Sequence, residues 1–101
     1  MATEVDILYG GSDTSPSAWI WGLDTSACAD VIGGAIGLSS GEVSVTILQT
    51  ERPKICPDVE FVISSADVPS PKERAQLERR LVEELRPLLP EDRIHMVRVL
   101  P

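Results

Sequence analysis

The sequence of 101 residues repeats one order of residue classes in its two halves. Residues 4–13 read EVDILYGGSD: acidic, apolar, acidic, three apolar residues, then small residues and an aspartate. Residues 58–67 read DVEFVISSAD and follow the same order at an offset of 54 (58 − 4). The Ser-Pro pair at 15–16 recurs at 70–71, one position further along. Such a repeat predicts two copies of one supersecondary unit, which constrains the fold before any single element is considered.

The first half has the pattern of a strand, a helix and a second strand. Apolar and polar residues alternate over residues 5–9 and again over 43–47, which predicts two strands. Between them, apolar residues recur three and four positions apart, as on one face of a helix. We expect this helix to begin at the Ser-Pro pair at 15–16, or later with Thr25 or Ser26 as its N-cap.

The second half carries a stronger helix signal between its two strands, which are predicted at 59–63 and 94–100. Residues 70–73 (SPKE) form a capping box, with the serine as N-cap and the glutamate reaching back to it. Leucines then mark one helix face: Leu77, Leu81, Leu85 and Leu88. The opposite face offers two ion pairs at a spacing of four residues, Arg79–Glu83 and Arg80–Glu84.

These elements predict an α+β fold. A helical crossover makes the two strands of each half parallel, and the two β-α-β units then join into a four-stranded sheet with both helices on one face. We expect a single domain of residues 1–101, with repeat one at 3–50, a linker at 51–57 and repeat two at 58–101. A ferredoxin-like module, which keeps the same elements in another strand order, is the alternative.

The sheet face without helices must meet water or a partner. The residues expected there are of mixed polarity: Asp6, Leu8, Ser44, Thr46, Leu48, Glu60 and Val62. The three aliphatic side chains among them would contribute to an exposed patch that self-association can cover. We therefore expect a symmetric homo-oligomer.

Several stretches of the chain resemble the tautomerase superfamily, which includes proteins similar to macrophage migration inhibitory factor. They are the strand that runs into Gly-Gly-Ser within residues 2–13, the glycine-rich helix end and following strand at 29–38 and 42–47, and the unit at 59–100. The resemblance implies a trimer or hexamer built from duplicated β-α-β units, with active sites between subunits.

The resemblance also places the expected site at the start of the chain. The family's catalytic residue is a proline that becomes the first residue once methionine is removed, and its secondary amine is a general base. Ala2 stands at this position here, and Ser12 stands where many members have an arginine. If Met1 is removed, the primary amine of Ala2 is the candidate catalytic group, as a base or an imine-forming nucleophile. The alternative is an inert terminus, and the departure from proline removes the residue on which the family's usual activity depends.

The other candidate site residues are three cations and one aromatic side chain. Arg52, Lys54 and Arg98 are candidates for binding a substrate carboxylate, which arginine can hold through two parallel hydrogen bonds. Tyr9 is a candidate for lining a ligand cavity between subunits. The alternatives are ordinary surface charge for the cations and packing in the core or an interface for the tyrosine.

The composition narrows the range of partners and cofactors. A net charge of −7 disfavours nucleic acid and anionic membrane surfaces, and no apolar run reaches the length of a membrane span. We expect no cofactor and no metal, because His95 is the single histidine and Cys28 and Cys56 lack metal-ligand spacing. The two cysteines are expected to be free thiols in a cytoplasmic protein. His95 is expected to be a solvated or hydrogen-bonded strand residue.

Together these patterns predict a protein similar to the tautomerases that binds or acts on a small enolisable or carboxylate-bearing compound. Two other functions stay open. One is a non-catalytic homologue that serves as an oligomeric scaffold or as the inactive subunit of a hetero-oligomer. The other is a ferredoxin-like module that binds a ligand or a protein.

Overall fold

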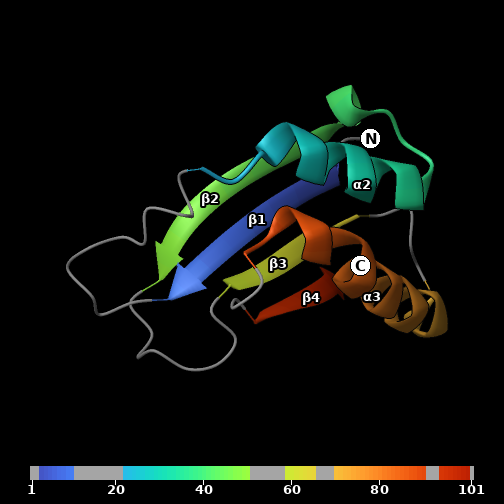
Figure 1. Cartoon of the computed structure of the whole chain (residues 1–101). Helices are drawn as coiled ribbons and strands as arrows, with labels where there is room; N and C mark the ends of the chain where they lie inside the picture. The colour runs from blue at the N-terminus through green and yellow to red at the C-terminus, as the bar shows by residue number, and fades with distance from the viewer. Residues whose placement is uncertain (1–2, 11–21, 51–58, 66–69, 91–93, 101) are drawn as a thin grey trace.

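The computed structural model describes residues 3–10, 22–50, 59–65, 70–90 and 94–100. The main elements follow in the order β1 (Thr3–Gly10), α2 (Thr25–Ile36), β2 (Val43–Thr50), β3 (Val59–Ser64), α3 (Pro71–Leu85) and β4 (His95–Leu100). Short 3-10 turns precede β2 and follow α3, at Ser40–Glu42 (η1) and Arg86–Leu88 (η2). Figure 1 shows both helices packed on the same face of the sheet. The predicted linker at 51–57 lies outside the described residues.

The four strands form one sheet in the order β2-β1-β3-β4. β1 and β2 are parallel, β3 and β4 are parallel, and the two halves join through the antiparallel pair β1 and β3. This is the predicted pair of β-α-β units in an α+β fold. The ferredoxin-like alternative is wrong, because its split β-α-β units would place another strand between the two strands of each half.

The core lies between the sheet and the two helices. Every second residue of β1 from Val5 points into it, and β3 contributes Val59, Phe61 and Ile63. The buried residues that form it are Val5, Ile7, Tyr9, Leu23, Cys28, Ala29, Ile32, Val43, Val59, Phe61, Ile63, Leu77, Leu81, Leu85, Leu89, Val97 and Val99. The core is thus mostly aliphatic, with Tyr9 and Phe61 as its aromatic side chains.

Helix α2 begins at the later of the two expected starts. The Asp24 side chain accepts a hydrogen bond from the Ala27 N–H at 3.0 Å, so Asp24 is the N-cap and the expectation of Thr25 or Ser26 was wrong. Aspartate is as good an N-cap as serine because its carboxylate reaches the free N–H groups of the first turn. The helix ends where Gly37 adopts φ 82°, a left-handed conformation that favours glycine. The Ser-Pro pair at 15–16 lies outside the described residues.

Helix α3 begins and ends in a different way. Ser70 is its N-cap residue and Pro71 stands in the first turn, but within the described chain the Ser70 side chain forms no capping hydrogen bond. That half of the predicted capping box is therefore absent. The predicted Arg80–Glu84 pair is present at 3.2 Å, whereas Glu83 pairs with Arg86, also at 3.2 Å, instead of with Arg79.

The open face of the sheet carries apolar side chains mainly on its two edge strands. The large exposed hydrophobic residues are Leu48, Ile94, Met96 and Leu100, at 43%, 56%, 40% and 36% exposure. Val62, expected to be exposed, is only 7% exposed because it lies on the central strand β3, between Asp6 on β1 and Arg98 on β4. The patch is therefore placed more toward β4 than the sequence indicates.

Candidate functional site

The start of β1 is buried and held by a side-chain contact. Thr3 is fully buried, and its hydroxyl donates to the Oγ of Ser65 at 3.1 Å. The Ser65 N–H donates in turn to the Leu100 carbonyl at 3.3 Å, and Thr3 is aligned with Val43 on β2. The first residues of β1 and β2 and the last residues of β3 and β4 therefore meet at one end of the sheet. The chain enters the sheet there, one residue after Ala2.

Three of the predicted site residues lie outside the described residues. They are Ala2, Arg52 and Lys54. The structure describes the other two, Arg98 and Tyr9, and places them on opposite faces of the sheet.

Arg98 lies on the open face of β4 and is paired with a buried carboxylate. Its Nε is 3.3 Å from Oε1 of Glu60, a residue of β3 that is only 8% exposed. The Arg98 side chain itself is 51% exposed, so most of its guanidinium donors remain accessible from the open face. Arg98 is aligned with Val62 and, one strand further, with Asp6, which places it about 10 Å along the strands from Thr3. It therefore lies near the middle of the sheet, about as far from the chain start as from the other end of β1.

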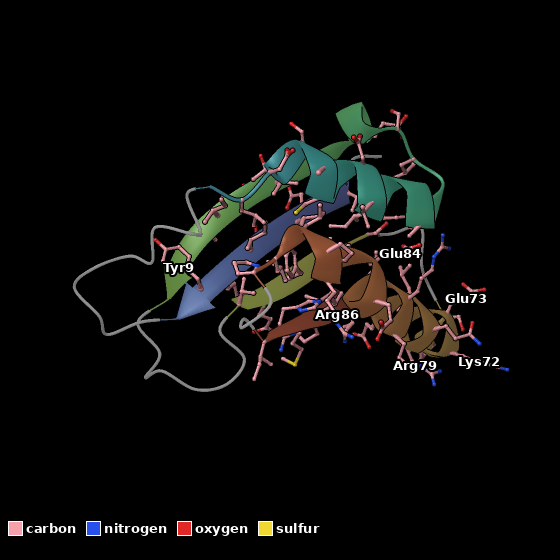
Figure 2. All side chains as sticks on the ribbon, in the orientation of Figure 1. Tyr9, Lys72, Glu73, Arg79, Glu84 and Arg86 are labelled. Atoms are coloured by element: carbon pink, nitrogen blue, oxygen red, sulfur yellow. The ribbon has the colours of Figure 1, made fainter. Side chains whose placement is uncertain are left out.

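Tyr9 lies at the other end of β1, in the core under the helices. It is 7% exposed and belongs to the cluster of buried residues, as the packing interpretation of this aromatic residue expects. Figure 2 shows it near the end of β1, away from the labelled charged side chains of α3 and η2. Six residues of extended strand separate it from Thr3, which is about 20 Å. Within one chain, Tyr9 and the chain start therefore cannot contact the same small molecule.

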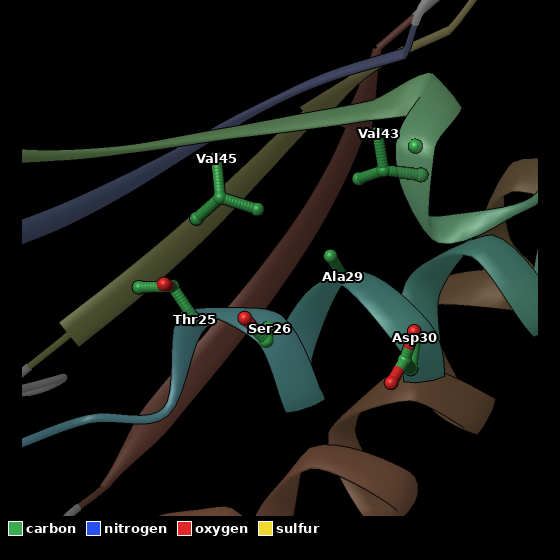
Figure 3. A pocket seen from close by; sticks show the side chains of 7 residues that line it. Thr25, Ser26, Ala29, Asp30, Val43 and Val45 are labelled. Atoms are coloured by element: carbon green, nitrogen blue, oxygen red, sulfur yellow. The ribbon is translucent and has the colours of Figure 1, made fainter.

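Two cavities lie between a helix and the edge strand of the same repeat. One, of about 370 Å³, lies between α2 and β2 and is lined by Thr25, Ser26, Ala29, Asp30, Gly41, Val43 and Val45 (Figure 3). The other, of about 420 Å³, lies between α3 and β4 and is lined by Glu78, Arg79, Val82, Glu83, His95, Met96 and Val97. Neither is lined by Thr3, Tyr9 or Arg98, so both are separate from the site at the chain start.

His95 is a hydrogen-bonded strand residue, as the sequence indicates. Its Nε2 lies 2.9 Å from the Val82 carbonyl oxygen on α3, and its ring meets the Phe61 ring edge-on with centroids 6.1 Å apart. Because a carbonyl oxygen can only accept, Nε2 carries the proton in this contact. The ring therefore ties β4 to α3, and the described residues show no partner that makes it a catalytic base.

The buried thiol of Cys28 is a poor nucleophile. Burial, with a smaller contribution from the negative charge of Asp24, raises the pKa of Cys28 to about 11. The thiolate is the reactive form, so nearly all of this group is unreactive at neutral pH. Across the described ranges, no group of three or more His, Cys, Asp or Glu side chains is placed to hold a metal ion. Neither described helix is long and apolar enough to cross a membrane.

Sequence reasoning missed two contacts between residues that lie far apart in the sequence. The Thr3–Ser65 contact joins residues 62 positions apart, and the Arg98–Glu60 pair joins two parallel strands across a crossover helix. The repeat places Thr3 and Ser65 in separate units, so only the antiparallel register of β1 and β3 brings them together. That register is not encoded by any local motif.

No protein-family model matches the chain, and no curated protein matches its sequence. Solved structures do match its fold. Pt0534 inactivated by 2-oxo-3-pentynoate matches with a TM-score of 0.60 and 18% identity, over 96% of this chain and 83% of that chain. The macrophage migration inhibitory factor-like protein from Entamoeba histolytica matches with a TM-score of 0.57 and 10% identity, over 96% and 85%. Q0 fused 4-OT, a wild-type symmetric trimer, matches with a TM-score of 0.55 and 14% identity, over 97% and 85%.

These similarities, together with the two β-α-β units joined through β1 and β3, show the fold of the tautomerase superfamily. The likeness spans nearly the whole chain, as the resemblance in the sequence implies. At these identities the likeness is one of fold, and the chemistry has to be argued from the residues of this chain.

Proposed function

We propose that the chain forms a homotrimer or hexamer in the cytoplasm and binds a small enolisable or carboxylate-bearing compound where β1 begins. The observation that carries this proposal is the buried contact of Thr3 with Ser65 at 3.1 Å, next to Ala2 in the sequence. A reacting group acts efficiently only when it is attached to a rigid element that fixes its position. The Thr3–Ser65 contact supplies such an attachment for the chain start.

In this proposal the amine of Ala2, once Met1 is removed, is the reacting group. Its ordinary pKa is about 8, so a useful fraction is the free base near neutral pH. The free base can accept a proton from a carbon next to a carbonyl group, or attack a ketone to form an imine with loss of water. The similar structure inactivated by 2-oxo-3-pentynoate supports 2-oxo acids as the compound class.

Arg98 is the described cation best suited to hold the carboxylate of such a compound. Its guanidinium faces the open side of the sheet, about 10 Å along the strands from the level of Thr3, and Glu60 contacts it at Nε. The remaining guanidinium N–H groups can bind a second carboxylate. Arg52 and Lys54 are further candidates in this proposal. Tyr9 can take part only from a neighbouring copy, because it lies about 20 Å from Thr3 in its own chain.

The proposal is tested by trapping the imine. The protein is incubated with pyruvate or phenylpyruvate and sodium borohydride, and the modified peptide is located by mass spectrometry. We expect a reduced adduct on the N-terminal peptide that starts at Ala2. The Arg98→Ala variant should need at least tenfold more 2-oxo acid, because a hydrogen bond between two charged groups contributes about 1.5–3 kcal/mol.

Two controls make the trapping experiment decisive. Arg80→Ala removes an exposed arginine of α3 that pairs with Glu84 of the same helix, and it should leave trapping unchanged. Protein acetylated at its N-terminus should lose the adduct. Equal adduct in acetylated and unmodified protein, carried by Lys54 or Lys72, would contradict the role of Ala2.

A second candidate function is that of a non-catalytic member of an oligomer. The observation that favours it is Ala2 itself, which stands where the family has its catalytic proline. In that case the Ala2→Pro variant should gain the ability to tautomerise phenylpyruvate, while the native chain has no such activity. The absorbance of the enol measures the reaction. A native chain that tautomerises phenylpyruvate as fast as the variant would exclude this second candidate.

A further inference from the structure

The cavity between α2 and β2 belongs to the half of the chain that has no positively charged side chain. Residues 1–50 contain six carboxylates and neither Lys nor Arg, whereas all nine Lys and Arg residues follow residue 50. Asp30 is the carboxylate that lines this cavity, and none of the described residues around it is a Lys or Arg. A ligand that enters the cavity therefore meets a negative charge without a competing cation from the same repeat.

The polar side of the cavity offers three oxygen-bearing side chains. Asp30 is exposed, and within the described part of the chain it has no ion-pair or hydrogen-bond partner. Ser26 lies four residues earlier on the same face of α2, because residues i and i+4 are neighbours on a helix surface. Thr25 lines the cavity beside it. An ammonium group carries three N–H donors, which match the carboxylate and the two hydroxyl oxygens.

The other side of the cavity is apolar. Figure 3 shows Val43 and Val45 directed from β2 toward Ala29 and Thr25 on α2. The cavity volume of about 370 Å³ lies within the range of about 300–1,000 Å³ that is typical of small-molecule sites. Such a wall favours a ligand with a short hydrocarbon chain, because the removal of methylene groups from water is favourable.

The first turn of a helix does not by itself attract a cation, since its free N–H groups carry partial positive charge. In α2 the carboxylate of Asp24 opposes this charge, because it caps the helix and accepts the Ala27 N–H at 3.0 Å. After the larger effect of burial, the negative charge of Asp24 also helps to raise the pKa of the Cys28 thiol. Asp30 lies beyond the first turn, so the helix start does not cancel its attraction for a cation.

We propose that the α2/β2 cavity binds a small aliphatic ammonium ion, with the ammonium group at Asp30 and Ser26 and the hydrocarbon chain along Val43 and Val45. This ligand is opposite in charge to the carboxylate-bearing compound of the proposed function. Neither Thr3 nor Arg98 lines the cavity. The two sites are therefore separate and can be tested separately.

The corresponding cavity of the second repeat, between α3 and β4, explains why the site is expected in one repeat alone. Glu78 and Glu83 line that cavity, but Glu78 accepts the Val99 N–H at 2.8 Å and Glu83 pairs with Arg86 at 3.2 Å. Arg79 lines it as well and would repel a cation. Because its carboxylates already have partners, an ammonium ion should prefer the α2/β2 cavity.

The test is a titration of the isotope-labelled protein with butylammonium chloride, followed by the amide signals in two-dimensional NMR spectra at constant ionic strength. We expect saturable shifts at residues 25–30 and 41–45. Asp30→Asn keeps the shape of the side chain and removes its charge, so it should weaken binding at least about tenfold. Glu73→Gln removes one negative charge at an exposed position of α3 and should bind like the wild type. Butyrate, which has the same chain length and the opposite charge, should cause no shift at these residues.

The outcomes separate a built site from a general attraction of cations to a chain of net charge −7. Shifts that do not saturate, that spread over the acidic residues of both repeats, or that persist in Asp30→Asn would overturn the site, as would the absence of any shift. Each of these results leaves the proposed function standing, because the trapping of an imine at Ala2 does not depend on Asp30. Saturable binding that is weakened in Asp30→Asn and retained in Glu73→Gln supports the site.

Discussion

The two repeats fold alike but bury different side chains beneath their helices. Helix α2 buries small residues, Cys28, Ala29 and Gly33, around a single Ile32. Helix α3 buries three leucines spaced four residues apart, Leu77, Leu81 and Leu85. The same topology is thus reached with a small-residue helix in one half and a leucine helix in the other. The comparison teaches that the order of elements is preserved between the repeats, while the pattern of buried helix positions and the residues that fill them differ.

The helices also differ in how their ends are stabilised. α2 contains Gly33 and Gly34, which lower its intrinsic helix stability, and it has a side-chain N-cap at Asp24 and a left-handed glycine at Gly37. α3 is rich in good helix formers and begins at Pro71 without a capping side-chain bond. The capping interactions are therefore found at the ends of α2, the helix with the lower intrinsic stability.

The largest effects should come from truncating the buried centre of each helix. Leu81 and Ile32 are both fully buried, so Leu81→Ala and Ile32→Ala should each reduce the free energy of unfolding by about 2–5 kcal/mol. Urea unfolding followed by circular dichroism measures both. Gln76→Ala, at an exposed position of α3, is the control and should change stability by less than about 0.5 kcal/mol. An Ile32→Ala cost close to that of the control would break the comparison, because α2 would then contribute little packing.

The second effect concerns Cys28, a buried titratable residue of α2. Its pKa of about 11 lies above the ordinary value of 9.0, mainly because of burial. In a Cys56→Ser background at pH 8, a thiol reagent should label Cys28 on the order of 100-fold more slowly in the native state than in urea, since the thiolate is the reactive form.

The same shift predicts how stability changes at alkaline pH. The unfolded thiol ionises near pH 9 and the folded thiol near pH 11. The stabilising contribution is therefore complete below pH 9 and is lost as the pH rises through 11. In the Cys56→Ser background, the Cys28→Ala variant should lose less stability between pH 8.5 and pH 10.5 than the parent (roughly the window of the shift). An identical pH profile for the two proteins would contradict the burial of the thiol.

The third effect uses two adjacent glycines of α2 as a matched pair. A Cβ on Gly33 would lie 2.8 Å from the Leu38 carbonyl oxygen, whereas a Cβ on Gly34 would meet nothing within 4 Å. Gly33→Ala should therefore destabilise the protein by about 1–3 kcal/mol through crowding against the main chain. Gly34→Ala should stabilise it by up to about 1 kcal/mol through helix propensity. Thermal unfolding of both variants gives the two signs, and a stabilising Gly33→Ala would show that the Leu38 carbonyl is not held close to Gly33.

Much of the fold could be predicted from the sequence because local patterns of residues indicate its strands and helices. Alternation located the strands, leucine spacing located α3, and the repeat led to two β-α-β units. The start of α2 was harder, because Asp24, Thr25 and Ser26 are all good N-cap residues. Only the geometry of the Ala27 N–H decides among them.

The candidate site was less predictable because its contacts are non-local. Arg98 was chosen as a cation that interrupts an apolar strand, but nothing in its neighbourhood indicates Glu60, 38 positions earlier (98 − 60). Tyr9 was chosen as an aromatic residue, and alternation with Val5 and Ile7 already indicated that it faces the core. A sequence pattern assigns a residue to a face of the sheet, but strand order and register decide which residues on that face meet.

The smallest effect compares the two helix starts directly. Asp24→Ala removes the oxygen that accepts the Ala27 N–H at 3.0 Å and should cost about 1 kcal/mol, while Asp24→Asn keeps an acceptor there and should cost much less. Ser70→Ala removes a side chain that makes no capping hydrogen bond, so its cost should be below about 0.5 kcal/mol. Urea unfolding at pH 7 measures all three variants. If Ser70→Ala proved as costly as Asp24→Ala, the serine would cap α3 in solution. The two helices would then begin alike, and the difference between the repeats would lie in their buried residues alone.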